Sequence, residues 1–321
     1  MQETAKNNSF VRFLKYLWTE HSIVVVFIVI FGICAIIAPP RFFTIDNVMT
    51  IVRNASIIGV IAIGMTFVII TGGIDLSAGH VVAVTGSVLI LLQGNENIPM
   101  AVAIAACIAT GAAIGFVNGF ITAKFKVPAF IVTLAIGTIA RSITMWQLQG
   151  RTIMGRNVPE FTNIGGGQIG IIPNAFIVWG IIAIIMGCIL AYTKFGSYIY
   201  AVGGNENAAR YSGINVDRIR IIAYVITGAC VGVAALISMS RMAAVSPTTS
   251  GMLYEFDAIT AAVVGGAALS GGKGRIYGTV LGMILIAIVS NLMIMMQISP
   301  FLSGTVKGVI ILLAVLLQRK G

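Results

Sequence analysis

Long apolar stretches alternate with short polar ones along nearly the whole chain. About 20 apolar residues are needed to cross the hydrocarbon core of a bilayer. Ten segments approach this length, at 22–38, 55–71, 81–92, 100–122, 129–146, 175–192, 221–238, 258–269, 276–298 and 301–317. The pattern therefore predicts an all-α polytopic membrane protein with about ten transmembrane helices. Two of the segments, 81–92 and 258–269, are short for a span, and either extend into the glycine-rich segments beside them or form half-helices.

Composition supports this fold class. The chain has 321 residues, of which 58% are hydrophobic and 9% charged, and its mean hydropathy is +1.01. A soluble domain carries about 25% charged residues. These values argue against a soluble enzyme, a nucleic-acid-binding protein and a disordered protein. The net charge of +10 is better explained by basic cytoplasmic loops than by nucleic acid as a partner.

The distribution of lysine and arginine predicts the orientation. With the N-terminus placed inside, the cytoplasmic side collects Lys6, Arg12, Lys15, Lys124, Lys126, Lys194, Arg210, Arg218, Arg220, Lys273, Arg275, Arg319 and Lys320. The outer side collects fewer: Arg41, Arg53, Arg151, Arg156 and Arg241. This bias predicts that both termini lie in the cytoplasm.

Two basic residues fall within predicted spans, Arg141 and Lys307. A charge centred in lipid is costly. Arg141 therefore lies near the outer end of its helix or faces a water path, and Lys307 pairs with Asp75 or Glu255.

The chain divides into three parts. Residues 1–21 are a cytoplasmic N-terminal segment, residues 22–317 form one transmembrane domain with a long cytoplasmic loop at 193–220, and residues 318–321 are a cytoplasmic tail. The first apolar segment ends at Ala38-Pro39-Pro40, and proline after a candidate cleavage site favours a retained helix over a signal peptide. We expect any energy source to be on another chain.

The motifs of common catalytic sites are missing from the sequence. The nearest approach to a phosphate-binding G-x-x-x-x-G-K-[ST] loop, at 267–274, has Ala267 in place of the first glycine and Gly274 in place of Ser or Thr. The two histidines, His21 and His80, do not form H-E-x-x-H, and G-x-S-x-G is absent. We expect no catalytic residue, metal site or cofactor on this chain.

A glycine-rich segment at 71–79 reads Thr-Gly-Gly-Ile-Asp-Leu-Ser-Ala-Gly. Adjacent glycines interrupt a helix, and broken backbone at membrane depth is tolerated where it lines a protein-enclosed path. The segment is either a hinge or gate beside a pathway, with Gly72, Gly73, Asp75 and Ser77 as its residues, or an ordinary cytoplasmic turn. In either case we expect Asp75 to cap the following helix by accepting from amides of residues 76–79.

A second glycine-rich segment at 265–274 repeats the spacing of the first. Gly72 aligns with Gly265, Gly73 with Gly266 and Ser77 with Ser270. The agreement suggests an internal duplication of the kind found in transporters, and makes Gly265, Gly266 and Ser270 further candidates for the gate. Whether the halves are parallel or inverted depends on the two short spans and stays open.

The cytoplasmic loop is predicted to contain a short helix between glycines. Asn205 is a good N-cap, Glu206 suits the first turn, and Gly213 suits the position after the C-terminus. A helix of about two turns is marginal alone in water. It docks either on its own membrane domain or on a cytosolic partner.

Together these motifs identify a family resemblance. Gly73-Ile74-Asp75-Leu76-Ser77, residues 200–214 and residues 265–275 resemble the ribose-type monosaccharide ABC transporter permeases, with the same order and spacing from about residue 40 to the C-terminus. The resemblance implies that the short helix couples to an ATPase through Gly203, Gly204, Asn205, Glu206, Ala208, Ala209, Arg210 and Gly213.

The resemblance also implies the partners. It predicts a multi-pass permease of the bacterial inner membrane, surrounded by lipid, in which two copies of the chain form the pathway. ATP and Mg²⁺ would be bound by a cytosolic ABC ATPase, and a periplasmic binding protein would deliver a monosaccharide to the outer loops 41–54, 147–174 and 239–257. The sequence does not identify the sugar.

Two alternatives remain. One is a permease of a related ABC importer, for branched-chain amino acids or another small solute. The other is an ion-coupled secondary carrier, for which Asp75 is the one acid placed to act inside the membrane.

Overall fold

The computed structural model describes residues 40–299 continuously, and outside that range only residues 31, 32, 36–38, 302, 304, 305, 308, 309 and 312. The predicted spans at 22–38 and 301–317 therefore lie outside the continuous part. The described helices are η1 (Pro40–Phe43), α3 (Ile45–Ile70), α4 (Ala78–Gln93), α5 (Met100–Phe125), α6 (Ala129–Gln147), α7 (Pro159–Gly166), α8 (Asn174–Tyr192), α9 (Lys194–Gly204), α10 (Glu206–Tyr211), α11 (Val216–Met242), α12 (Tyr254–Val264) and α13 (Ile276–Met295).

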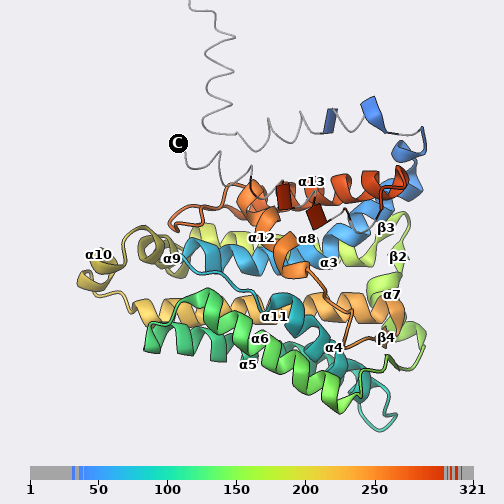
Figure 1. Ribbon diagram of the computed structural model, residues 1–321, viewed down its shortest axis with the longest axis horizontal. Coiled ribbons are helices and arrows are strands. Elements are labelled where there is room, and N and C mark those ends of the chain that lie inside the picture. Colours follow the sequence, from blue (N-terminus) through green and yellow to red (C-terminus); the bar gives the residue numbers. More distant parts are fainter. Residues whose placement is uncertain are drawn as a thin grey trace, which may run out of the picture.

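Four two-residue strands join loops at one end of the helices. β1 (Ile153–Met154) pairs antiparallel with β4 (Ala244–Val245), and β2 (Gln168–Ile169) pairs with β3 (Ile172–Pro173). Figure 1 shows α9 and α10 at the left end of the molecule, and α7 with β2, β3 and β4 at the right. We call these the α10 end and the α7 end.

Six helices are long and apolar enough to cross a membrane: α3, α5, α6, α8, α11 and α13. They confirm an all-α membrane protein. α4 and α12 have 16 and 11 residues, which gives them lengths of about 24 and 16 Å, short of a core about 30 Å thick. The predicted segment 258–269 is corrected, because α12 ends at Val264 and residues 265–269 are not helical.

The buried centre is formed by α3 and α11. Of the most apolar window in each helix, 83% is buried in α3 and 67% in α11, against 22% in α5 and in α6. Apolar side chains on α6 and α8, such as Ile139, Ile143 and Ile184, are exposed. A helix that is apolar all round and exposed on one side is suited to lipid.

α5 and α11 pack backbone to backbone. Side chains added at Gly111 and Gly115 would collide with the carbonyl oxygens of Gly228 and Tyr224, and a Cβ on Gly119 would lie 2.8 Å from Ile221 Cα. Small residues every fourth position permit this close approach. The glycine ladder is thus used for packing within the chain.

α4 begins deep inside the bundle. Its N-terminus lies beside Asn118, which donates to Ser77 Oγ at 2.8 Å, and beside Gly137, where a Cβ would stand 2.9 Å from Ser77 Cα. Asn118 is seven residues before the end of α5 and Gly137 eight residues after the start of α6. Both helix ends lie at the α10 end, so α4 starts about 10–12 Å below that end.

α12 starts near the same depth and runs the other way. The Glu255 carboxylate occupies the space where Gly79 would carry a side chain. From this meeting point α4 runs toward the α7 end, where Gln93 bonds the backbone of Arg156, and α12 runs toward the α10 end. The half-helix interpretation of the two short segments agrees with this geometry, and the two helix–turn–half-helix units, α3–α4 and α11–α12, have opposite directions.

The contact between α5 and α11 gives a direct stability test. Gly115→Ala should lower the unfolding temperature of the detergent-purified protein by several degrees, because overpacking costs about 1–3 kcal/mol. Gly180→Ala is the matched control: no described atom lies within 4 Å of its Cβ position, so the better helix former should be neutral or stabilising. Equal effects of the two substitutions would contradict the close contact.

Candidate functional site at the α10 end

α10 is a short helix with both ends capped. Asn205 Oδ1 accepts a hydrogen bond from the Ala208 amide at 3.0 Å, as expected for an N-cap. At the other end Gly213 has φ +81°, and the Gly213 and Ile214 amides donate to the Arg210 and Ala209 carbonyls, each at 3.1 Å. The predicted short helix and its caps are confirmed.

The segment before α10 is also helical, which the sequence analysis did not predict. α9 covers Lys194–Gly204, with Thr193 Oγ1 accepting from the Gly196 amide at 3.2 Å. Gly203 and Gly204 are therefore the last residues of α9 and are not part of the short helix. The loop at 193–220 thus contains two consecutive helices joined at Asn205.

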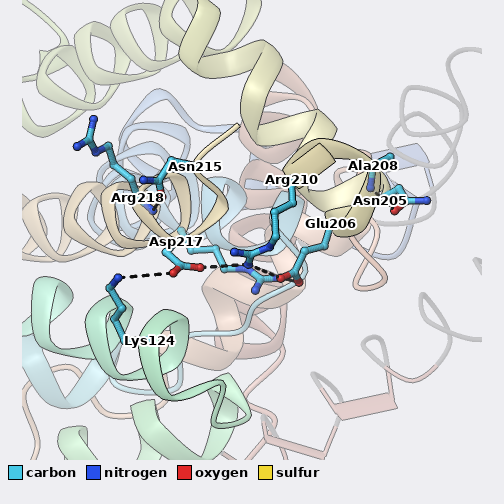
Figure 2. A network of polar contacts seen from close by, with 9 residues as sticks. Lys124, Asn205, Glu206, Ala208, Arg210, Asn215, Asp217 and Arg218 are labelled. Carbon is cyan, nitrogen blue, oxygen red and sulfur yellow. Dashed lines mark hydrogen bonds and ion pairs between the residues drawn. The ribbon is translucent and has the colours of Figure 1, made fainter. Parts of the chain in front are cut away.

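A network of ion pairs holds α10 on the membrane domain (Figure 2). Glu206 pairs with Arg210 at 2.9 Å and with Arg220 at 2.7 Å, Arg210 pairs with Asp217 at 3.2 Å, and Asp217 pairs with Lys124 at 3.8 Å. The network connects α10 to the first turns of α11 and the last turn of α5. Each pair is partly exposed and is worth at most about 1 kcal/mol, so its main effect is to fix the orientation of a six-residue helix.

The ionisation of Glu206 depends on this network. The hydrogen bond from the Arg210 guanidinium, reinforced by Arg220, holds the pKa of Glu206 below its ordinary value. A carboxylate with a lowered pKa stabilises the folded arrangement at neutral pH, and this contribution is lost as the pH falls through the lowered pKa. The attachment of α10 is therefore complete at physiological pH.

The end of α9 touches both glycine-rich segments through backbone atoms. A side chain at Gly203 would collide with the Ile70 carbonyl oxygen, at the end of α3, and would lie 2.6 Å from the Gly272 amide nitrogen. The Gly272 amide in turn donates to the Ile70 carbonyl at 2.8 Å. We call this meeting of Ile70, Gly203 and Gly272 the glycine junction.

A side chain of α9 adds a second attachment to the later segment. The Tyr200 hydroxyl donates to the Gly274 carbonyl oxygen at 2.7 Å. The segment itself is folded by two backbone hydrogen bonds, from Ala268 to the Lys273 carbonyl at 3.0 Å and from Gly271 to the Ala268 carbonyl at 2.9 Å. The segment that leads to α10 is therefore bonded to the loop before α13.

The helices before the two glycine-rich segments, α3 and α12, end in the same backbone conformation. The matching residues are shifted by one position from the alignment predicted from the sequence. Gly72 has φ +80° after α3 and Gly266 has φ +93° after α12, whereas Gly265 has φ −68°. The next amides, of Gly73 and Ala267, each close a bond to the carbonyl five residues back, at 3.0 and 2.9 Å. Gly72 therefore corresponds to Gly266, and the predicted alignment with Gly265 is corrected.

Asp75 is buried and bonded to its neighbour Ser77. Its Oδ1 accepts from the Ser77 amide at 2.9 Å and from the Ser77 hydroxyl at 2.5 Å. The expected cap is thus only partly formed, since the Leu76 amide donates instead to Thr133 Oγ1 at 3.0 Å. Asp75 therefore lies at the entrance to α4 and is linked to the Asn118 amide through the Ser77 hydroxyl.

A cavity of about 390 Å³ lies between the first glycine-rich segment and α10. It is lined by Thr71, Gly72, Gly73, Thr122, Lys126, Val127, Ala129, Glu206, Asn207, Arg220 and Tyr224. The candidate gate residues Gly72 and Gly73 and the first residues of α10 therefore line the same cavity. The lining also includes the turn between α5 and α6.

The remaining predicted gate residues lie elsewhere. Gly265 packs on α13, where its Cβ would stand 2.5 Å from the Gly278 carbonyl carbon, and Ser270 is exposed at the α10 end. The second glycine-rich segment thus contacts α9 and α13 and does not line the cavity.

Of the two basic residues within predicted spans, Arg141 lies in the described part of the chain. Arg141 donates to the carbonyl oxygens of Ser250 and Gly79, the latter at 3.4 Å. It therefore faces the meeting point of the two half-helices, six residues before the C-terminal end of α6. Lys307 lies outside the described residues.

Sequence reasoning missed several residues of this site, among them Asp217, Arg220, Lys124 and Tyr200. The alternation of acids and bases over residues 206–220 is a signal that could have indicated Asp217 and Arg220 as partners of α10. Lys124 and Tyr200 have no such signal, because their partners are distant in sequence.

Comparison with known proteins places the chain in a family. Residues 47–315 match the family described as "Branched-chain amino acid transport system / permease component". The chain is 40% identical over 96% of both chains to the ribose import permease protein RbsC of Escherichia coli (strain K12). It is 39% identical to RbsC of Bacillus subtilis (strain 168), over 88% of this chain and 87% of the relative.

The L-arabinose transport system permease protein AraH of Escherichia coli (strain K12) is 36% identical, over 94% of this chain and 91% of the relative. No solved structure matches the chain. Because the family match covers most of the sequence and these relatives align over nearly their whole length, the chain belongs to this family of transport-system permease components.

Proposed function

We propose that the chain is the membrane-spanning permease subunit of an ATP-driven importer for a monosaccharide, with ribose as the first candidate. The identity to ribose, allose and arabinose permeases supports a sugar. The single observation that carries the coupling part of the proposal is the capped, ion-paired α10 at one end of the bundle.

The proposal includes the partners. Two copies of the chain form the pathway in the bacterial inner membrane, a cytosolic ABC ATPase binds ATP and Mg²⁺, and a periplasmic binding protein delivers the sugar. Lys124, Lys126, Arg210, Arg218 and Arg220 lie on or beside the helix ends at the α10 end, which supports a cytoplasmic position for that end. The full arrangement then has ten helices with both termini inside.

α10 presents a surface suited to a protein partner. Ala208 and Tyr211 are exposed, Tyr211 to 91%, while Ala209 is buried against the membrane domain. A large exposed aromatic side chain on a helix held in place is a common anchor of protein interfaces. We assign the coupling role to α10 and its caps, residues 205–213. Gly203 and Gly204, at the end of α9, precede this helix, and Gly203 connects it to the membrane domain.

The function is tested by purification and transport. The chain, expressed with its cognate ATPase, should copurify with it in mild detergent, and the assembly with its binding protein should import ribose into proteoliposomes only when ATP is supplied on the ATPase side. Leucine uptake is the second candidate, because the family description names branched-chain amino acids. Uptake by the chain alone under an ion gradient would contradict ATP coupling.

Reversing the charge of Arg210 should uncouple transport. Arg210→Glu places a third acid between Glu206 and Asp217, so α10 loses its orientation, and we expect uptake to fall at least about tenfold while the protein still inserts. Arg218→Glu is the matched control, since Arg218 is exposed in the same region and forms no ion pair within the described residues. Uptake and ATP hydrolysis are measured together.

If Arg210→Glu left uptake at the level of Arg218→Glu, the assignment of α10 as the coupling helix would be wrong.

Gly203 and Gly204 form a second matched pair. Gly203→Ala forces its new methyl group against the Ile70 carbonyl oxygen, whereas Gly204→Ala meets no described atom within 4 Å. We expect Gly203→Ala to reduce ATP-driven uptake strongly and Gly204→Ala to retain it within about twofold. The same reduction in both variants would show that the glycine junction is irrelevant to coupling.

A further inference from the structure

The cavity at the α10 end is polar and of ligand size. Its volume of about 390 Å³ lies within the range of about 300–1,000 Å³ that small-molecule sites occupy. Hydroxyl, amide and charged side chains from four separate parts of the chain form its wall. The exposed residues Gly72, Lys126 and Asn207 mark the mouth, and the buried residues Thr71, Gly73 and Tyr224 mark the floor.

Hydrogen-bonding capacity is left unused inside the cavity. Thr122 Oγ1 is buried and has no partner among the described residues. Buried polar atoms are nearly always satisfied, so an unpaired hydroxyl in a cavity wall indicates a site for a polar guest. Two of the charges at the wall, on Glu206 and Arg220, bond each other at 2.7 Å. The third, on Lys126, is exposed at the mouth, so the interior of the cavity favours a neutral guest over an ion.

The polar lining continues inward along one face of α5. Asn118 lies one turn deeper than Thr122, is fully buried, and its Oδ1 also has no partner among the described residues. Its amide donates to Ser77 Oγ, which donates to Asp75. Polar groups thus extend from the cavity wall at Thr122 to the start of α4, about 10 Å inside the bundle.

The cavity wall is partly made by the coupling segment. Glu206 and Asn207 belong to α10, and Arg220 is bonded to α10 through Glu206. The opposite side is the first glycine-rich segment, which directly follows Ile70, whose carbonyl meets Gly203 in the glycine junction. A displacement of α10 therefore changes the width of the cavity directly.

We propose that this cavity is the exit chamber of the pathway, in which a monosaccharide contacts Thr122 before release at the α10 end. The inference rests on the proposed function. Neutral polyhydroxylated molecules match the chamber because each hydroxyl both donates and accepts, as the unpaired groups of the wall require.

Filling the chamber tests this assignment. Thr122→Phe should reduce ATP-driven ribose uptake at least about tenfold, while the variant still copurifies with the ATPase. Val117→Phe adds an aromatic ring to the same helix at a position that is 43% exposed and outside the cavity lining, and should leave uptake within about twofold. Equal uptake by both variants would overturn the proposal.

A chemical version of the test avoids any folding defect of the phenylalanine variant. Thr122→Cys is assembled into the importer, shown to transport, and then treated from the ATPase side with maleimides of increasing size. Inhibition should grow with the size of the adduct at residue 122, as identified by peptide mass spectrometry. The unsubstituted chain, with its own cysteines, and Val117→Cys are treated in parallel.

The outcomes distinguish a failure of the proposed function from a failure of the exit-chamber proposal. If the untreated, unsubstituted importer takes up none of ribose, allose and arabinose with ATP, the proposed function fails. If it transports one of these sugars but a large adduct at Thr122→Cys leaves uptake unchanged, or residue 122 is never labelled, the exit chamber is refuted. A size-dependent block of residue 122 alone confirms it.

Discussion

Non-helical backbone inside a membrane protein has to be enclosed by other parts of the protein, and the architecture described above depends on this constraint. Residues 71–77 and 243–253 leave the helical pattern between long helices and half-helices. Their polar groups are covered by α5, α6 and α11, through contacts such as Leu76 to Thr133 and Arg141 to Ser250. The close packing of α5 on α11 brings these helices near enough to the non-helical segments to cover their polar groups.

The same requirement explains where the chemistry of the site lies. Because α4 begins about 10 Å inside the bundle, the segment that leads to it borders both the cavity and the end of α3. The cavity and α10 are neighbours for this reason, although Gly73 and Glu206 are far apart in the sequence. The meeting of α4 and α12 forms a second polar centre, closed by Arg141 and Glu255.

Sequence patterns predicted the helices well because membrane spans are specified by local apolarity, and the caps of α10 because Asn205 and Gly213 act on adjacent backbone. The alignment of Gly72 with Gly265 was based on residue identity alone. The φ angles show that Gly72 and Gly266 share the same backbone conformation. Helix α9 was missed since its polar and small residues resemble a loop. Contacts such as Tyr200 with Gly274 and Lys124 with Asp217 could not be predicted, because they depend on how distant segments pack.

The glycine junction has a consequence for how this protein can vary. Gly203, Ile70 and Gly272 meet through main-chain atoms, so no side chain of intermediate size can weaken or strengthen the contact by degrees. The connection between the two helices of the loop and the membrane domain is stiff and does not admit gradual tuning. Substitutions that keep these glycines can alter this end of the molecule by degrees only elsewhere, in the charges around α10 and in the residues that line the cavity.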